Sequence, residues 1–158
     1  MTAASAPRGA VRPGCFYLIR HARAEGTAPG GDAGRRLTPE GRDAFRQSVL
    51  SLVGRLVVRR IHASPLLRAR QTGDLLAAML GAPLEEEGEL ASGVSSARRL
   101  LALGAELGDG AALIGHNPEL AEAIGLAAGR ELDIPPGTVA AIGLDGRLAW
   151  LAHPGRRR

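Results

Sequence analysis

Short apolar runs alternate along the chain with longer segments in which apolar residues recur at helical spacing. The runs have the length of buried strands and lie at about residues 15–19, within 57–63 and at 111–114. The helically spaced segments predict helices that end near Leu56, at Gly81, near Leu107 and near Ala128. An alternation of strands and helices is typical of an α/β fold with a mainly parallel sheet.

Helix-start signals precede several of these segments. Thr38-Pro39-Glu40 places a capping hydroxyl before a proline suited to the first helical position, with an acid in the first turn. Ser64-Pro65 repeats this order, so Ser64 is predicted to cap the second helix. Ser95 or Ser96 is predicted to cap the third.

Two apolar runs near the C-terminus, 138–144 and 147–152, flank Asp145-Gly146. An Asp-Gly pair between such runs is a strong hairpin signal. The segment 83–93 is predicted to be an acidic connection. The fold expected from the whole pattern is a three-layer α/β domain. It has a mainly parallel central sheet, helices on both faces and an antiparallel edge hairpin.

The size and composition of the chain fit one globular domain. It has 158 residues, of which 45% are hydrophobic and only 3% aromatic, so the core must consist of Leu, Val, Ile and Ala. Residues 1–14 are rich in small residues and proline and are predicted to be a disordered leader. The domain is predicted at 15–155, followed by a basic tail at 156–158.

The excess of basic over acidic residues lies at the ends of the chain. The formal net charge is +4 and all 20 basic residues are arginines. Five of them lie in the leader and the tail, which leaves 15 arginines against 16 acidic residues in the predicted domain. A nearly neutral domain with few aromatic residues is not expected to bind nucleic acid. A local positive pocket remains compatible with this balance.

Cysteine and hydropathy patterns indicate the compartment. Cys15 is the only cysteine, so no disulfide forms within the chain and a reducing compartment is expected. No apolar run reaches the length of a signal peptide core or of a membrane span. The sequence thus predicts a cytoplasmic protein without a membrane partner, as a monomer or weak dimer.

Polar residues follow three of the predicted strands where each strand ends. They are Arg20-His21, the segment Ser64–Arg68 and Gly115-His116. The carboxyl ends of parallel strands share one edge of a sheet, so these residues are expected to converge there. Arginine presents a planar set of donors that suits phosphate, and histidine has a ring nitrogen that can act as a nucleophile. The sequence therefore predicts a phosphate site.

Together these segments resemble the histidine phosphatase superfamily over about residues 16–153. The matching motifs are Leu18-Ile19-Arg20-His21, Ser64-Pro65-Leu66-Leu67-Arg68-Ala69-Arg70-Gln71-Thr72 and Gly115-His116-Asn117-Pro118. Asp32-Ala33-Gly34-Arg35-Arg36-Leu37-Thr38 is similar to the short bacterial branch, the phosphohistidine phosphatases. The resemblance implies that His21 is the nucleophile that takes the phosphoryl group. It also implies that Arg20, Arg68 and His116 hold the phosphate oxygens.

These implied roles agree with elementary electrostatics. Phosphoryl transfer mainly requires positioning and neutralisation of the equatorial oxygens. Cations next to His21 are expected to lower the pKa of its ring, which leaves the ring neutral and able to attack. The other ring nitrogen is expected to donate to a backbone carbonyl, which fixes the tautomer.

Two departures from the family pattern concern the residues after each histidine. Ala22 follows His21 where many relatives have glycine, and Asn117 follows His116 where the acid phosphatase branch has an aspartate as proton donor. Glu89 is the predicted proton donor, because the mutase-like and short branches place a carboxylate at the position of Gly88-Glu89-Leu90. The neighbouring run Glu85–Glu87 leaves the alternative of a solvated acidic loop open.

The remaining features exclude other chemistries. No two of the four histidines have ligand spacing on a helix, so no metal site is predicted, and His62 is expected to be structural. The chain has no lysine and hence no Walker-type phosphate loop. The predicted function is a metal-independent, cofactor-free phosphatase with a shallow site that acts on protein phosphohistidine. The alternatives are a small-molecule phosphomonoesterase, for a phosphate ester substrate, and a non-catalytic phosphate-binding module.

Overall fold

The computed structural model describes residues 14–155, which form one six-stranded sheet in the order β3-β2-β4-β1-β5-β6. The strands are β1 (Cys15–Arg20), β2 (Arg60–Ala63), β3 (Leu84–Glu86), β4 (Ala111–Gly115), β5 (Val139–Gly143) and β6 (Leu148–Ala152). Neighbouring strands from β3 to β1 are parallel, whereas β5 is antiparallel to both β1 and β6. The predicted mainly parallel sheet with an antiparallel edge hairpin is confirmed.

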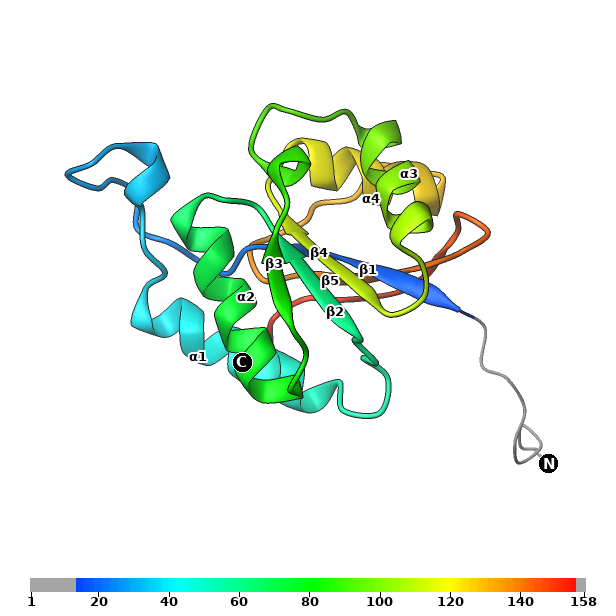
Figure 1. Cartoon of the computed structure of the whole chain (residues 1–158), viewed down its shortest axis with the longest axis horizontal. Helices are drawn as coiled ribbons and strands as arrows, with labels where there is room; N and C mark the ends of the chain where they lie inside the picture. The colour runs from blue at the N-terminus through cyan, green and yellow to red at the C-terminus, as the bar shows by residue number, and fades with distance from the viewer. Residues whose placement is uncertain (1–13, 156–158) are drawn as a thin grey trace.

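Four helices cover the sheet in two layers (Figure 1). They are α1 (Pro39–Ser51), α2 (Leu67–Leu80), α3 (Ala97–Leu107) and α4 (Glu119–Ala128). Side chains of β1 alternate between the faces: Tyr17 and Ile19 join the core under α1 and α2, and Phe16 and Leu18 join the core under α3 and α4. All four β1 side chains are buried, so both faces of this central strand are covered.

Helix α3 approaches β1 closely because it has a glycine at the contact. A Cβ atom on Gly104 would lie 2.1 Å from Cε2 of the Phe16 ring. Any larger residue would push the helix away from the sheet, so Gly104 and Phe16 together set the depth of this layer.

Two of the predicted caps are confirmed and one is wrong. Thr38 Oγ1 accepts from the Gly41 amide at α1, and Ser96 Oγ accepts from the Arg99 amide at α3. Helix α2, however, begins at Leu67, and its cap makes no side-chain hydrogen bond. Ser64 lies in the turn before the helix, where tertiary contacts hold it.

The first helix is shorter than predicted. It ends at Ser51 rather than near Leu56, and Gly54 in the following turn has a φ of 92°. Leu52 and Leu56 are nevertheless 2% and 6% exposed, because the turn folds back onto the same core. Apolar residues at helical spacing therefore continue beyond the end of α1, and for this reason the predicted end of the helix lay too far along the chain.

Strand β3 was not predicted, since its residues are mostly acidic. It pairs in parallel with β2, with Ile61 opposite Leu84 and Ala63 opposite Glu86. A three-residue edge strand of this kind needs few apolar side chains, because two of its three residues are exposed to solvent. The expectation of a mere connection at this point was wrong. A single-turn 3-10 helix, η2 (Gly88–Leu90), follows β3.

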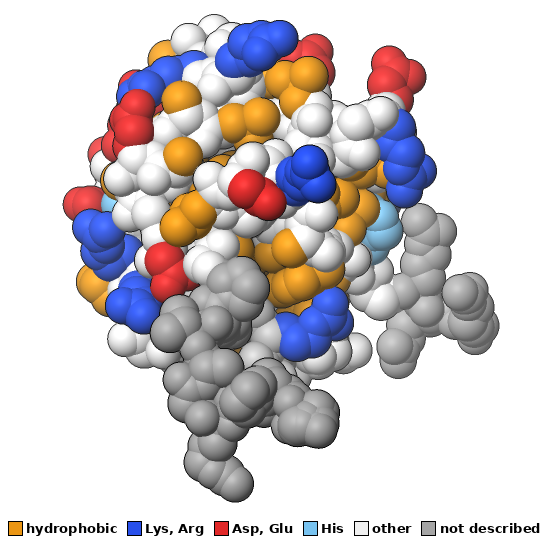
Figure 2. Space-filling view, turned by 90° about the vertical axis from the view of Figure 1, so that its right-hand side faces the viewer, with side chains coloured by type: hydrophobic (Ala, Val, Ile, Leu, Met, Phe, Trp, Pro, Cys, Tyr) orange, Lys and Arg blue, Asp and Glu red, His pale blue; other side chains and the backbone are white. Residues whose placement is uncertain are grey.

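The surface shows no segregation of charge on the face seen in Figure 2, where arginine and acidic side chains are interspersed. Among residues 14–155, no helix has the length and hydrophobicity needed to cross a membrane. The predicted leader, except Gly14, and the predicted basic tail lie outside the described residues. The cytoplasmic location and the state of monomer or weak dimer stay predictions.

Candidate active site

The polar residues that follow β1, β2 and β4 meet at one edge of the sheet. In the parallel register Arg20 lies opposite Gly115, and Ala63 lies opposite Ile114. Backbone hydrogen bonds continue the pairing past the strand ends, from the His21 amide to Gly115 O at 3.1 Å and from the Ser64 amide to Ile114 O at 3.0 Å. Hydrogen bonds of the sheet therefore hold the residue that follows each strand in place, His21 after β1 and Ser64 after β2.

His21 and His116 face each other at this edge. Their ring centroids are 5.2 Å apart, and the two residues are only 5% and 4% exposed. His21 Nδ1 lies 2.7 Å from the carbonyl oxygen of Ala22. Because that oxygen only accepts, Nδ1 carries the proton and the Nε2 lone pair is available for attack. The expected backbone partner for the second ring nitrogen is thus present.

Burial and nearby cations keep both histidines neutral. Burial, followed by the charges of Arg20 and Arg68, lowers the pKa of His21 to about 4 against the upward effect of its bond to Ala22. Burial, followed by His21 and Arg68, lowers the pKa of His116 to about 3. A neutral imidazole is the form that acts as a nucleophile.

The two predicted arginines are anchored by groups outside the strand tips. Arg20 Nη1 donates to Ile134 O at 2.9 Å. Arg68, which is 4% exposed, donates from Nη1 to Asp32 O at 2.9 Å and from Nη2 to Asp32 Oδ2 at 3.1 Å. Asp32 also accepts from Arg35 at 3.0 Å. Hydrogen bonds from Arg35 and then Arg68 lower the pKa of Asp32, so this carboxylate is ionised.

Three buried nitrogens of the cluster that consists of Arg20, His21, Arg68 and His116 have no hydrogen-bond partner within residues 14–155. They are Nε of Arg20, Nε of Arg68 and Nδ1 of His116. Leaving a buried polar group unpaired costs roughly 1–3 kcal/mol. An oxyanion between these side chains would accept from them, so the arrangement suits a bound phosphoryl group next to His21 Nε2.

Two residues of the longest motif, Gln71 and Thr72, hold the loops around the cluster through hydrogen bonds. The sequence had not indicated this role. Thr72 Oγ1 accepts from the Ala22 amide at 2.9 Å and donates to Arg68 O at 2.8 Å. Gln71 Oε1 accepts from the Leu37 amide at 2.8 Å. The presence of both residues in the motif was the available signal. The two amides from which they accept lie 50 and 34 residues away in the chain, so no local pattern indicated these hydrogen bonds.

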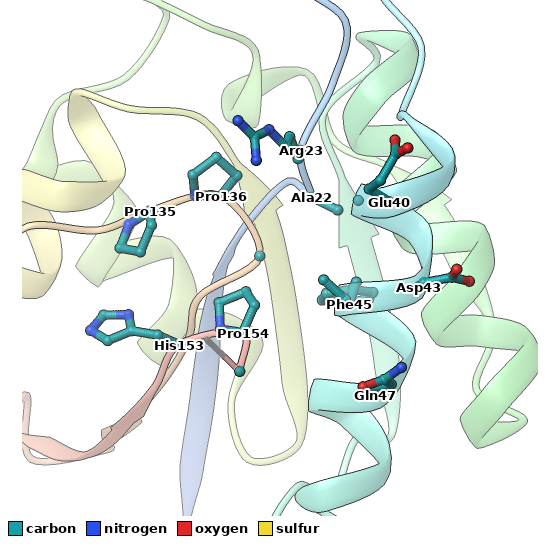
Figure 3. Close-up of a pocket in the computed structure, with 14 residues that line it drawn as sticks. Ala22, Arg23, Glu40, Asp43, Phe45, Gln47, Pro135, Pro136, His153 and Pro154 are labelled. Atoms are coloured by element: carbon teal, nitrogen blue, oxygen red, sulfur yellow. The ribbon is translucent and has the colours of Figure 1, made fainter. Parts of the chain in front are cut away.

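A groove of about 630 Å³ begins at Ala22, directly after the nucleophile candidate. Figure 3 shows Arg23 and Pro136 at one end of it, with Glu40 and Phe45 of α1 along one wall. None of the four clustered side chains lines this groove. It is thus an adjoining surface feature and not the phosphate site.

Glu89 is bound by a residue outside this cluster. Its carboxylate accepts two hydrogen bonds at 2.9 Å from Arg99, one from Nε and one from Nη2. These bonds lower the pKa of Glu89, whereas a general acid near neutral pH needs a raised pKa. Within the described part of the chain, no hydrogen bond or ion pair joins Glu89 to His21 or Arg68. Its role as proton donor stays a prediction.

Within 14–155, no three His, Cys, Asp or Glu side chains come together as a potential metal-binding group. His62 is buried in β2, with Nδ1 3.8 Å from Glu85 Oε2 at the neighbouring edge strand.

We expect His21 and His116 to titrate far below the ordinary imidazole value of 6.5, with midpoints near 4 and 3. As the pH falls from about 6.5 toward 4, the unfolded chain takes up these protons before the folded one, so folding stability also decreases. NMR titration of the histidine rings, with circular dichroism to follow unfolding, measures both effects. A midpoint near 6.5 for His21 in the folded protein would contradict the geometry.

The comparisons with known proteins point to one family. The model of the histidine phosphatase superfamily (branch 1) matches residues 16–92. The solved structure of the protein histidine phosphatase SixA complexed with tungstate matches with a TM-score of 0.75 at 25% identity, over 89% of this chain and 97% of that chain. The SixA protein of Nakamurella multipartitia matches with a TM-score of 0.69 at 26% identity, over 92% of this chain and 100% of that chain.

A further solved structure, the SixA protein from Agrobacterium tumefaciens, has a TM-score of 0.75 at 24% identity and supports the fold. It covers 90% of this chain and 100% of that chain. No curated protein matches the chain. The resemblance indicated by the sequence motifs is confirmed by the family model and the SixA structures.

Proposed function

We propose that this chain, which belongs to the histidine phosphatase superfamily and is a phosphatase, removes the phosphoryl group from phosphohistidine on a protein. In this proposal the phosphoryl group passes to His21, and no metal ion takes part. The observation that carries the proposal is the free Nε2 of His21 beside three buried nitrogens without partners in the described chain.

The reaction proceeds in two displacements at phosphorus. His21 Nε2 attacks, the bond from phosphorus to the substrate imidazole breaks, and the substrate leaves as a neutral histidine. Water then attacks phospho-His21, which releases inorganic phosphate and restores the free ring. Arg20, Arg68 and His116 hold the phosphoryl oxygens in both displacements, where positioning and charge neutralisation lower the barrier.

Neither Asn117 nor Glu89 is poised as a proton donor, which favours phosphohistidine over a phosphate ester as the substrate. Asn117 has an amide that carries no acidic proton, and the Glu89 carboxylate is bound by Arg99 with a lowered pKa. An alkoxide leaving group needs a proton as its bond to phosphorus breaks. An imidazole departs neutral once its remote nitrogen carries a proton, which solvent supplies near neutral pH. The site is thus suited to the better leaving group.

The groove that begins at Ala22 supports a protein substrate. Its volume of about 630 Å³ lies between α1 and the segments 135–137 and 153–155, next to His21 in the chain (Figure 3). It gives room for residues that flank a phosphohistidine. The protein histidine phosphatase SixA, solved with the oxyanion tungstate, is a relative with the corresponding activity in its name.

We expect the protein to hydrolyse a phosphohistidine protein at least about tenfold faster than an alkyl phosphate ester, measured as kcat/KM. Chelator should leave both rates unchanged. Ester turnover without phosphohistidine turnover would favour the small-molecule phosphatase instead. Binding of inorganic phosphate without turnover of either substrate would favour the non-catalytic module, and inhibition by chelator would contradict a metal-independent reaction.

The same assay decides the role of Glu89. Because its carboxylate is ionised and held by Arg99, we expect Glu89→Gln to lower kcat/KM for phosphohistidine by less than about tenfold. Glu106→Gln is the matched control, since Glu106 also binds Arg99, through Nη1 at 3.0 Å. A loss of about 10²–10⁴-fold on the ester alone would establish Glu89 as a general acid for esters. Equal large losses on both substrates would contradict our expectation.

A further inference from the structure

We propose that Ser64 is a positioning residue that sets the tautomer of His116, so that Nδ1 of His116 carries the ring proton and presents it to the bound phosphoryl group. The phosphoryl ligand in this statement rests on the proposed function. The tautomer is a property of the free protein and can be measured without any substrate.

Only one arrangement of these hydrogen bonds lets the Ser64 hydroxyl both donate and accept. Ser64 is completely buried, and its Oγ lies 2.8 Å from Nε2 of His116. The same Oγ accepts from the Leu66 amide at 3.2 Å. A hydroxyl has one proton to donate, and the only acceptor that the described residues offer it is His116 Nε2. If Nε2 carried a proton instead, the buried hydroxyl proton would be left without an acceptor.

The consequence for His116 follows from the chemistry of imidazole. A neutral ring has one N–H, so a ring that accepts at Nε2 carries its proton at Nδ1. Nδ1 is a buried nitrogen without a partner in residues 14–155, and the ring lies 5.2 Å from that of His21. In this tautomer His116 donates a hydrogen bond to a phosphoryl oxygen while staying neutral. In the other tautomer Nδ1 of His116 would present a lone pair, which would repel the phosphoryl oxygen.

The sheet explains why these two side chains meet. Ser64 follows the last residue of β2 and His116 follows the last residue of β4. The Ser64 amide donates to Ile114 O at 3.0 Å, so the two neighbouring strands bring both residues to the same edge of the sheet, one register position apart. Adjacent strands lie about 4.8 Å apart, a distance that a hydroxyl and an imidazole span with one hydrogen bond. Ser64 thus binds His116 and is not the cap of α2 that the sequence predicted.

The decisive experiment is ¹⁵N NMR of the histidine rings in the substrate-free protein near pH 7, with His116→Gln to assign the signals. We expect a pyridine-type shift for Nε2 of His116 and a pyrrole-type shift for Nδ1. In Ser64→Ala this preference should be lost, and Ser64→Thr should restore it. Ser48→Ala, which removes a buried serine of α1, should leave the His116 shifts unchanged.

Activity gives a second, independent readout. We expect Ser64→Ala to lower kcat/KM by about 10- to 100-fold, as when a group that orients a functional histidine is removed. In a His116→Gln background the same change should have no further effect. A pyrrole-type Nε2 in the wild type, or unchanged His116 shifts in folded Ser64→Ala, would overturn the proposal. If Ser64→Ala does not fold, the wild-type shifts still decide. A protein without phosphohistidine turnover contradicts the proposed function but leaves the tautomer test intact.

Discussion

His21→Ala abolishes turnover and leaves the fold intact: this is the largest effect we expect. The variant removes the nucleophilic Nε2, and loss of a catalytic nucleophile costs on the order of 10³-fold or more in kcat. The side chain of His21 makes its hydrogen bond to the next residue in the chain, Ala22, so no long-range polar contact is lost. Stopped assays with a phosphohistidine protein measure the rate, and circular dichroism with thermal unfolding checks the fold.

A matched control uses another buried histidine of the same sheet. His62 lies in β2 and is 2% exposed, but its neighbour is Glu85 on the edge strand and not the His21 cluster. His62→Gln should therefore retain turnover, provided that unfolding is monitored in parallel. Unimpaired turnover in folded His21→Ala would contradict the proposed nucleophile.

Trapping gives the chemical identity of the intermediate. Wild-type protein quenched during turnover of a ³²P-labelled substrate should carry phosphate that is labile in acid and stable in base. Peptide mapping under basic conditions should place the label on His21. Label on another residue would identify a different nucleophile and refute the two-displacement route through His21.

Arg68→Ala has the second largest expected effect, a loss of about 10²–10³-fold in kcat/KM. Arg68 is 4% exposed, its Nη atoms bind Asp32, and its Nε is a buried donor without a partner among the described residues. The alanine variant loses the donors for the phosphoryl oxygens and leaves Asp32 facing the anion. Arg68→Lys keeps the charge but not the planar fork, so we expect an intermediate loss.

The matched control lies two residues further along α2. The Arg70 side chain is 44% exposed and pairs with Glu86, which is 51% exposed. Exposed pairs of this kind contribute about 0–1 kcal/mol to stability, and Arg70→Ala should retain near-wild-type activity. The inhibition constant for inorganic phosphate should rise in Arg68→Ala and stay constant in Arg70→Ala. Equal behaviour of the two variants would contradict the role of Arg68.

Much of the fold followed from local patterns. The apolar runs predicted β1, β2, β4 and the hairpin β5–β6, and Thr38 and Ser96 marked two helix starts. These signals act over a few residues, within reach of a single turn or strand. The sequence of the short edge strand β3 contains no such signal, because backbone pairing with β2 holds this strand and its own side chains contribute little.

The sequence alone determined which residue types follow each strand, and from them we predicted that Arg20, His21, Arg68 and His116 converge. That inference needed the rule that parallel strands end at one edge, together with the position of Arg68 in the first turn of its helix. The tertiary structure decided which hydrogen bonds these residues make. Ser64 bonds to His116 across 52 positions, Arg68 to Asp32 across 36, and Glu89 to Arg99 on the next helix. Such bonds depend on strand order and loop path, which no local pattern encodes, and they set the tautomers, the pKa shifts and hence the chemistry.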